Sequence, residues 1–168
     1  KATVFDHFCG GVNEEDCLPV INKLFKNNVY SVLDFSTEGF DSENEFDECL
    51  KKKISIIDFI RNKEEIPFAV FKPTCLGSTE LFKKISLNIT LSRDEDLLWL
   101  KVISRFEKVC QKAHEENIKI LIDAEEVEVQ KAIDDLAILM MRKFNLSKPV
   151  VFNTIQMYRK DRLTFLDE

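Results

Sequence analysis

The chain has few glycines, and their positions exclude several common catalytic and nucleotide-binding loops. Only four occur among 168 residues: Gly10, Gly11, Gly39 and Gly77. This spacing contains no GxGxxG, no GxxxxGK[ST] and no GxSxG. The usual glycine-rich phosphate loops and the nucleophile elbow of the hydrolases are therefore absent.

Histidine is scarcer still, with only His7 and His114, and neither follows a predicted strand. We therefore expect no histidine-based acid–base site and no metal site. The cysteines number five and no two lie closer than eight positions, so there is no CxxC and no zinc-ligand spacing. Reduced thiols in an intracellular compartment are the simplest interpretation.

The charge pattern and the lengths of the apolar runs exclude two further classes of partner. The net charge is −6, and no basic patch with interleaved aromatic residues is present, so we expect no nucleic-acid partner. No apolar run reaches the ~18 residues that a membrane span requires. The length fits one domain, covering residues 1–168, with a substantial hydrophobic core.

Short apolar runs alternate with longer amphipathic segments along the chain. The runs predicted as strands cover 29–35, 66–72, 118–123 and 149–154. The predicted helices cover 13–27, 43–60, 92–116 and 125–145, with a last one from about Tyr158 to Glu168. The strands are apolar on both faces, which is typical of parallel strands covered by helices. The pattern predicts an α/β fold of parallel strand–helix repeats after a lead-in helix.

Each predicted strand is followed by polar side chains. In chain order they are Asp34 and Glu38, then Lys72, then Asp123 and Glu125, then Asn153, Thr154 and Gln156. Because ligands bind at the carboxyl ends of parallel strands, we expect a site at that edge of the sheet. Lys72 suits an anionic ligand group, and the amide of Gln156 suits a flavin or purine edge.

Several stretches resemble the proline dehydrogenase family, most closely its single-function form. They are FDHFCGG, VLDFSTEG, FAVFKPTCLG, ILIDAEE, VQKAIDDL and KPVVFNTIQMYRKD, at residues 5–11, 32–39, 68–77, 120–126, 129–136 and 148–161. They occur in the family's order and cover nearly the whole chain. The resemblance implies a distorted (β/α)8 TIM-type barrel, of which this chain holds the first four strands.

The resemblance also implies an activity and partners. Family members oxidise L-proline to Δ1-pyrroline-5-carboxylate with FAD, and the reduced flavin passes electrons to a quinone in a respiratory membrane. We therefore expect peripheral membrane contact, in the bacterial cytoplasm or alternatively in the mitochondrial matrix.

The matching motifs imply roles for individual residues. Lys72 corresponds to the lysine that contacts the proline carboxylate, Asp123 to the aspartate beside substrate and flavin, and Gln156 to the glutamine on the flavin ring. Glu38 corresponds to a gate glutamate that pairs with an arginine near the substrate entrance. A second group of candidates comprises Asp34, Glu125, Asn153 and Tyr158.

The chain is shorter than the barrel that the resemblance implies, since a (β/α)8 barrel needs about 250 residues. We expect the missing C-terminal half to carry a KLVRGAY-like strand and paired arginines. On that basis we expect the fragment alone to be inactive and to bind FAD weakly or not at all. Its open edges predict self-association, or else a flattened sheet with helices on both faces, as in a small doubly wound domain. A non-catalytic α/β partner-binding module and another flavin barrel enzyme remain as alternative functions.

Overall fold

A computed structural model describes residues 9–34 and 39–167 of the chain. The strands are β1 (Val32–Leu33), β2 (Phe68–Phe71), β3 (Lys119–Ile122) and β4 (Val151–Asn153). The helices are α2 (Glu14–Phe25), α3 (Glu43–Ile60), the 3-10 turn η1 (Pro73–Leu76), α4 (Thr79–Ser86), α5 (Arg93–Glu115), α6 (Val127–Phe144) and α7 (Arg162–Asp167). The strands pair in parallel and in chain order, β1-β2-β3-β4. The predicted α/β strand–helix repeat is therefore confirmed.

The helix starts follow local capping chemistry. Ser92 and Glu95 form a capping box at the start of α5, and α2 begins after its cap Asn13 and runs through Pro19. The sequence pattern does not predict η1 or α4, because one or two turns are too short to show helical periodicity. The last helix begins at Arg162, later than predicted, because residues 157–161 form a turn.

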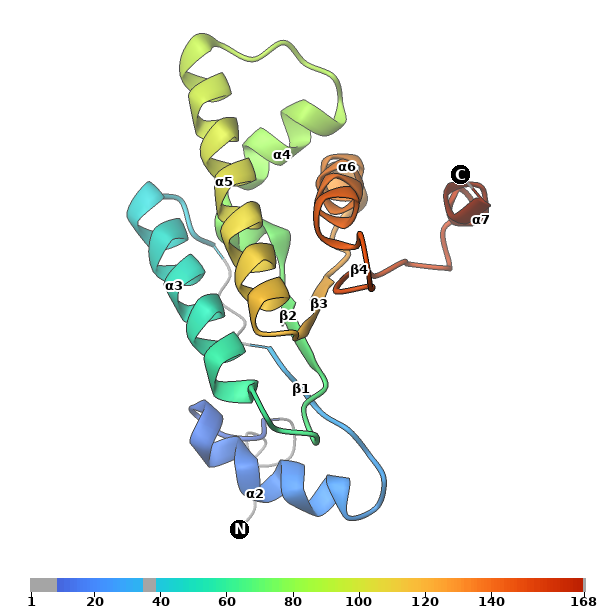
Figure 1. The fold of residues 1–168 in the computed structure, drawn as a ribbon. Helices are drawn as coiled ribbons and strands as arrows, with labels where there is room; N and C mark the ends of the chain where they lie inside the picture. The colour runs from blue at the N-terminus through green and yellow to red at the C-terminus, as the bar shows by residue number, and fades with distance from the viewer. Residues whose placement is uncertain (1–8, 35–38, 168) are drawn as a thin grey trace.

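The two faces of the sheet differ in burial. One face carries fully buried side chains, namely Ala69, Phe71, Ile120, Ile122 and Val151. The alternate positions, Phe68, Val70, Leu121 and Phe152, are only half-buried. Figure 1 shows α3, α5 and α6 side by side along one side of the sheet. The doubly wound alternative, with helices on both faces, is therefore wrong, and the sheet resembles part of an unclosed barrel wall.

Aromatic rings fill the layer between the sheet and the helices. Phe71 of β2 meets Phe106 of α5 edge-on, with ring centroids 5.2 Å apart, and Phe82 of α4 meets Trp99 at 5.3 Å. Trp99, which is only partly buried, thus packs against the core. Within residues 9–34 and 39–167, no helix is both long and apolar enough to cross a membrane.

Asparagine takes the place of glycine where three helices end. Asn28, Asn88 and Asn117 have φ angles of 59°, 55° and 57° after α2, α4 and α5. The next residue, in each case apolar, donates its backbone N–H to a carbonyl five positions back, at 2.9–3.1 Å. This is the bond of the Schellman motif, which satisfies a carbonyl in the last turn of the helix. The motif explains how the chain ends helices with so few glycines.

At Gly77 the packing of the core leaves no room for a side chain. A Cβ atom there would overlap Cγ2 of Val102, a buried residue of α5. We therefore expect Gly77→Ala to lower the free energy of unfolding by about 1–3 kcal/mol, measured by urea denaturation. Leu100→Ala, on the exposed side of the same helix, should change it by less than about 0.5 kcal/mol. If overlap is the cause, Gly77→Ala costs less in a Val102→Ala background, and an equal cost there contradicts the explanation.

Candidate functional site

The register of the sheet brings three strand ends into one row. Phe71, Ile122 and Asn153 are partners in neighbouring strands. The ladder continues one residue further, since Asp123 N–H donates to the Phe71 carbonyl and Thr154 N–H to the Ile122 carbonyl, both at 3.1 Å. Because side chains alternate along a strand, the next row of Lys72, Asp123 and Thr154 faces away from the helix layer.

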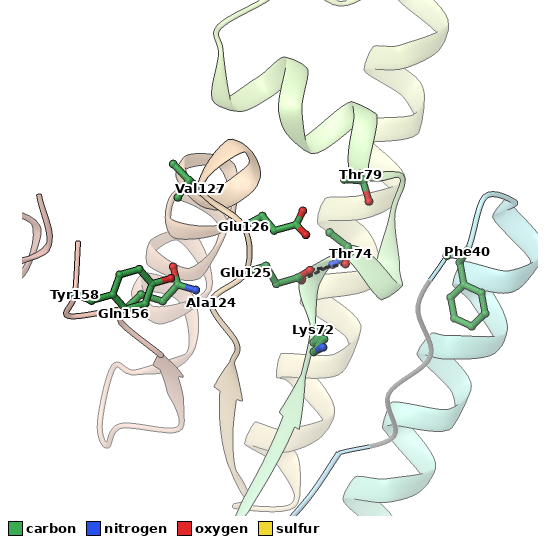
Figure 2. A pocket seen from close by; sticks show the side chains of 11 residues that line it. Phe40, Lys72, Thr74, Thr79, Ala124, Glu125, Glu126, Val127, Gln156 and Tyr158 are labelled. Atoms are coloured by element: carbon green, nitrogen blue, oxygen red, sulfur yellow. Dashed lines mark hydrogen bonds between the residues drawn. The ribbon is translucent and has the colours of Figure 1, made fainter. Parts of the chain in front are cut away.

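A cavity of about 510 Å³ opens at this edge of the sheet. Its lining comes from the loops after the four strands and from the starts of α4 and α6: Gly39, Phe40, Lys72, Thr74, Thr79, Ala124, Glu125, Glu126, Val127, Gln156 and Tyr158. Figure 2 shows these side chains around the opening. Lys72 is the only cation among the described residues that line it, and Glu125 and Glu126 are the acids.

The cavity gathers four of the predicted site residues, Lys72, Glu125, Gln156 and Tyr158. Asp123 lies at the end of β3 just before the lining residue Ala124. Its Oδ1 accepts a hydrogen bond from Thr154 Oγ1 at 3.0 Å, and that hydroxyl oxygen accepts from the Ala124 N–H at 2.7 Å. Thr154 therefore ties the loop after β3 to the end of β4.

Two candidates of the second group make contacts with the helix layer instead. Asp34, at the end of β1, pairs with Lys53 of α3 at 3.2 Å, and Lys53 is almost fully buried. Asn153 donates from Nδ2 to Asp134 of α6 at 3.0 Å. Asn153 points this way because its row of the sheet is that of Phe71 and Ile122. Glu38, the predicted gate residue, lies outside the described residues.

Glu125 is held by residues that the sequence pattern does not single out. Its Oε1 accepts from the Thr74 N–H at 2.9 Å and its Oε2 from Thr74 Oγ1 at 2.6 Å. Its own N–H donates to Oε1 of Gln130 at 2.8 Å. Burial raises the pKa of Glu125, and the Thr74 hydrogen bonds and the charge of Lys72 act against this rise. In the sequence, Gln130 could be noticed only as a polar residue next to Val129, one of the apolar residues that α6 buries.

A buried carboxylate on α6 joins this region to the last helix. Asp134 Oδ1 accepts from Gln130 Nε2 at 2.8 Å and from Asn153. Its Oδ2 accepts from Nη1 of Arg162, the first residue of α7, at 2.6 Å. One carboxylate thus connects the loop that carries Glu125, the end of β4 and the start of α7. Gln156 lies in the segment of chain between β4 and α7.

The family model for proline dehydrogenase matches residues 17–168. This chain belongs to the proline dehydrogenase family. The resemblance of the separate motifs is therefore confirmed over almost the whole chain.

Relatives and solved structures agree with this assignment. The chain is 31% identical over 161 residues to the carbapenem antibiotics biosynthesis protein CarD of Pectobacterium carotovorum, covering 96% of this chain and 43% of that protein. It is 39% identical over 70 residues to human mitochondrial proline dehydrogenase 1, covering 42% of this chain and 12% of that one. The crystal structure of proline utilization A (PutA) from Bdellovibrio bacteriovorus, inactivated by N-propargylglycine, superposes with a TM-score of 0.75 at 18% identity, covering 94% of this chain and 17% of that one.

These comparisons fix the family and the fold of the chain. The low identity to the PutA structure means that this likeness concerns the fold alone. The chain spans less than half the length of the curated relatives named above.

In this member of the proline dehydrogenase family, the Gln156 side chain suits the contact with a flavin ring that the resemblance implies for it. Oε1 of Gln156 is buried and, among residues 9–34 and 39–167, has no hydrogen-bond partner. A buried amide oxygen without a partner carries a desolvation cost that a ligand N–H can relieve. Gln156 also lines the cavity with Lys72, so its side chain fits a flavin ring bound there.

The hydrogen bonds of Asp134 should contribute more to the free energy of unfolding than the exposed ion pair of its neighbour Asp135. We expect Asp134→Ala to lower the free energy of unfolding by about 2–4 kcal/mol, because it leaves three donors, two of them on the buried residues Gln130 and Arg162, short of an acceptor. Asp135→Ala is the matched control: it removes the same charge from the same helix, and its pair with Lys131 is half-exposed on both sides. That change should cost less than about 1 kcal/mol. Equal costs in chemical denaturation would contradict the role of the network.

Proposed function

We propose that the protein oxidises L-proline to Δ1-pyrroline-5-carboxylate with a bound FAD. The observation that carries this proposal is the meeting of Lys72, Gln156 and Tyr158 around one cavity at the carboxyl ends of parallel strands, in a chain of the proline dehydrogenase family. Human, Arabidopsis and other relatives are named proline dehydrogenases, which supports the substrate.

The residues of the cavity have complementary roles in this proposal. The Lys72 ammonium binds the substrate carboxylate, and Gln156 donates to and accepts from the polar edge of the flavin ring. Asp123, fixed by Thr154, lies beside both ligands. The flavin, when bound, supplies the hydride acceptor.

The reaction requires orientation more than acid–base power. A hydride leaves the ring carbon that is bonded to nitrogen and carries no carboxylate, the nitrogen releases its protons to solvent, and the electron pair left on nitrogen forms the C=N bond. The enzyme gains rate by holding that carbon against the acceptor and by keeping water out. Fixed side chains on rigid strand ends suit this task, and the described cavity residues include no activated nucleophile.

The next acceptor of the electrons is a quinone, in our proposal, reached through peripheral contact with a respiratory membrane. The relatives from human, Arabidopsis and Dictyostelium are named mitochondrial, which supports a site in the mitochondrial matrix; a membrane-associated site in the bacterial cytoplasm is the other option. Cell fractionation followed by an assay with a soluble quinone separates these locations.

The activity is tested with the purified protein, expressed from its complete gene and loaded with FAD. Under anaerobic conditions L-proline should bleach the visible absorption of the flavin and yield Δ1-pyrroline-5-carboxylate. Lys72→Met should raise the KM for L-proline on the order of tenfold to a hundredfold, because it removes the charge that binds the carboxylate. Lys101→Met, on the exposed side of α5, is the control. An FAD-loaded protein that proline does not bleach would favour another flavin barrel enzyme, and a protein that binds no flavin would favour a partner-binding module.

We also propose that the chain self-associates through the half-buried face of its sheet. Phe68 of β2 and Phe152 of β4 meet there across β3, with ring centroids 5.7 Å apart, and Val70 and Leu121 lie on the same face. Exposed apolar surface of this kind favours association. For residues 1–168 expressed alone, we expect light scattering to give a mass above 19.6 kDa that falls when Phe152 is changed to Ser. A mass that stays at 19.6 kDa at high concentration contradicts the proposal.

A further inference from the structure

We propose that Glu125 is a positioning residue for Lys72, acting as a clamp on the chain segment that carries the lysine. The clamp consists of the two hydrogen bonds from Thr74 to the Glu125 carboxyl group. The inference rests on the proposed function, in which Lys72 binds the carboxylate of the substrate.

The backbone of Lys72 is fixed from its C-terminal side. Pro73 follows it, is buried, and begins η1 with a fixed φ angle. The carbonyl of Lys72 accepts the Cys75 N–H at 3.1 Å. Thr74, between them, is joined to Glu125, which lies 51 positions later in the sequence. A long flexible side chain such as lysine can be aimed only from a fixed backbone, so these contacts determine where the ammonium group can reach.

The clamp is itself anchored in the helix layer. The Glu125 N–H donates to Gln130, which is 2% exposed, and Gln130 donates onward to Asp134. Figure 2 shows the Thr74–Glu125 bridge beside Lys72 at the end of β2. Movement of the loop after β3 would therefore move Thr74, and with it the backbone of Lys72.

The bridge does not depend on the charge of Glu125. An ionised carboxylate accepts from both the N–H and the hydroxyl of Thr74, whereas a protonated one can still accept the N–H and donate to the hydroxyl oxygen. Glutamine offers the same acceptor and donor, so it can replace Glu125 in the clamp. Charges on Lys72 and Asp123 also act on Glu125, and a role based on charge or proton transfer would not survive this replacement.

The test uses the FAD-loaded protein and two probes of equal shape, cyclopentanecarboxylate and cyclopentanecarboxamide. Their dissociation constants, measured from the perturbed flavin absorption, give the preference of the site for a carboxylate. We expect Glu125→Ala to reduce this preference about tenfold and Thr74→Val to reduce it less. Glu125→Gln and Thr74→Ser should stay within about threefold of the unmodified protein, because each keeps the bridge.

Two further variants separate the clamp from other effects. In a Lys72→Met background, Glu125→Ala should cause no additional loss of carboxylate preference, because the clamp acts through the lysine. Glu126→Gln removes an equal charge from the same cavity wall and should change the preference by less than about twofold. Thermal unfolding of each variant shows that it is folded, and Thr74→Val decides the question if Glu125→Ala does not fold.

The outcomes distinguish this inference from the proposed function. If the site prefers the carboxylate probe but L-proline does not reduce the bound flavin, the proposed reaction is wrong and the clamp still stands. Conversely, a protein that oxidises proline while Glu125→Ala and Thr74→Val keep the full carboxylate preference overturns the clamp. If Glu125→Gln loses as much carboxylate preference as Glu125→Ala, the clamp is also overturned, in favour of a charge or proton-transfer role for Glu125.

Discussion

The parallel register of β2, β3 and β4 is the constraint on which the site depends. It aligns Phe71, Ile122 and Asn153 in one row and so sends Lys72, Asp123 and Thr154 to the opposite face. A slip of one residue in any strand would exchange these faces, and the carboxylate of Asp123 would then enter the apolar helix layer. The buried side chains of the helix layer, which hold the register, therefore also decide which polar groups reach the cavity.

The strand ends are joined by side chains as well as by the ladder. Thr154 links the loops after β3 and β4, and Thr74 with Glu125 links those after β2 and β3. Each link leaves a neighbouring residue, Asp123 or Lys72, with a restrained backbone. A cavity built in this way is organised before a ligand arrives, which lowers the entropy lost on binding.

The fold could be predicted from the sequence to the extent that it depends on local pattern. Apolar runs located the four strands, and the polar residues after them included Lys72, Glu125 and Gln156, which line one cavity. The residue pattern alone left open the choice between a barrel wall and a doubly wound sheet, because strands in both are rich in apolar residues, and the family resemblance was what favoured the barrel wall.

Contacts that depend on distance in space could not be predicted. Thr74 and Glu125 are 51 residues apart, and no local signal pairs them. Asn153 and Thr154 are adjacent polar residues at a strand end, and only the register shows that Asn153 faces α6 and Thr154 faces the open side. The buried polar position of Gln130 was visible as an interruption of an apolar stripe, but its partner was not.

The asparagines that end α2, α4 and α5 give the scarcity of glycine a thermodynamic meaning. Asn28, Asn88 and Asn117 adopt the left-handed conformation at some local cost, which glycine would avoid. In exchange, asparagine has fewer conformations than glycine in the unfolded chain, so less entropy is lost on folding. These turns also fix where the chain leaves each helix, and after α2 and α5 they aim it into β1 and β3. The order of the cavity edge thus depends in part on turns at the opposite end of the sheet, where asparagine leaves the unfolded chain less freedom to lose than glycine would.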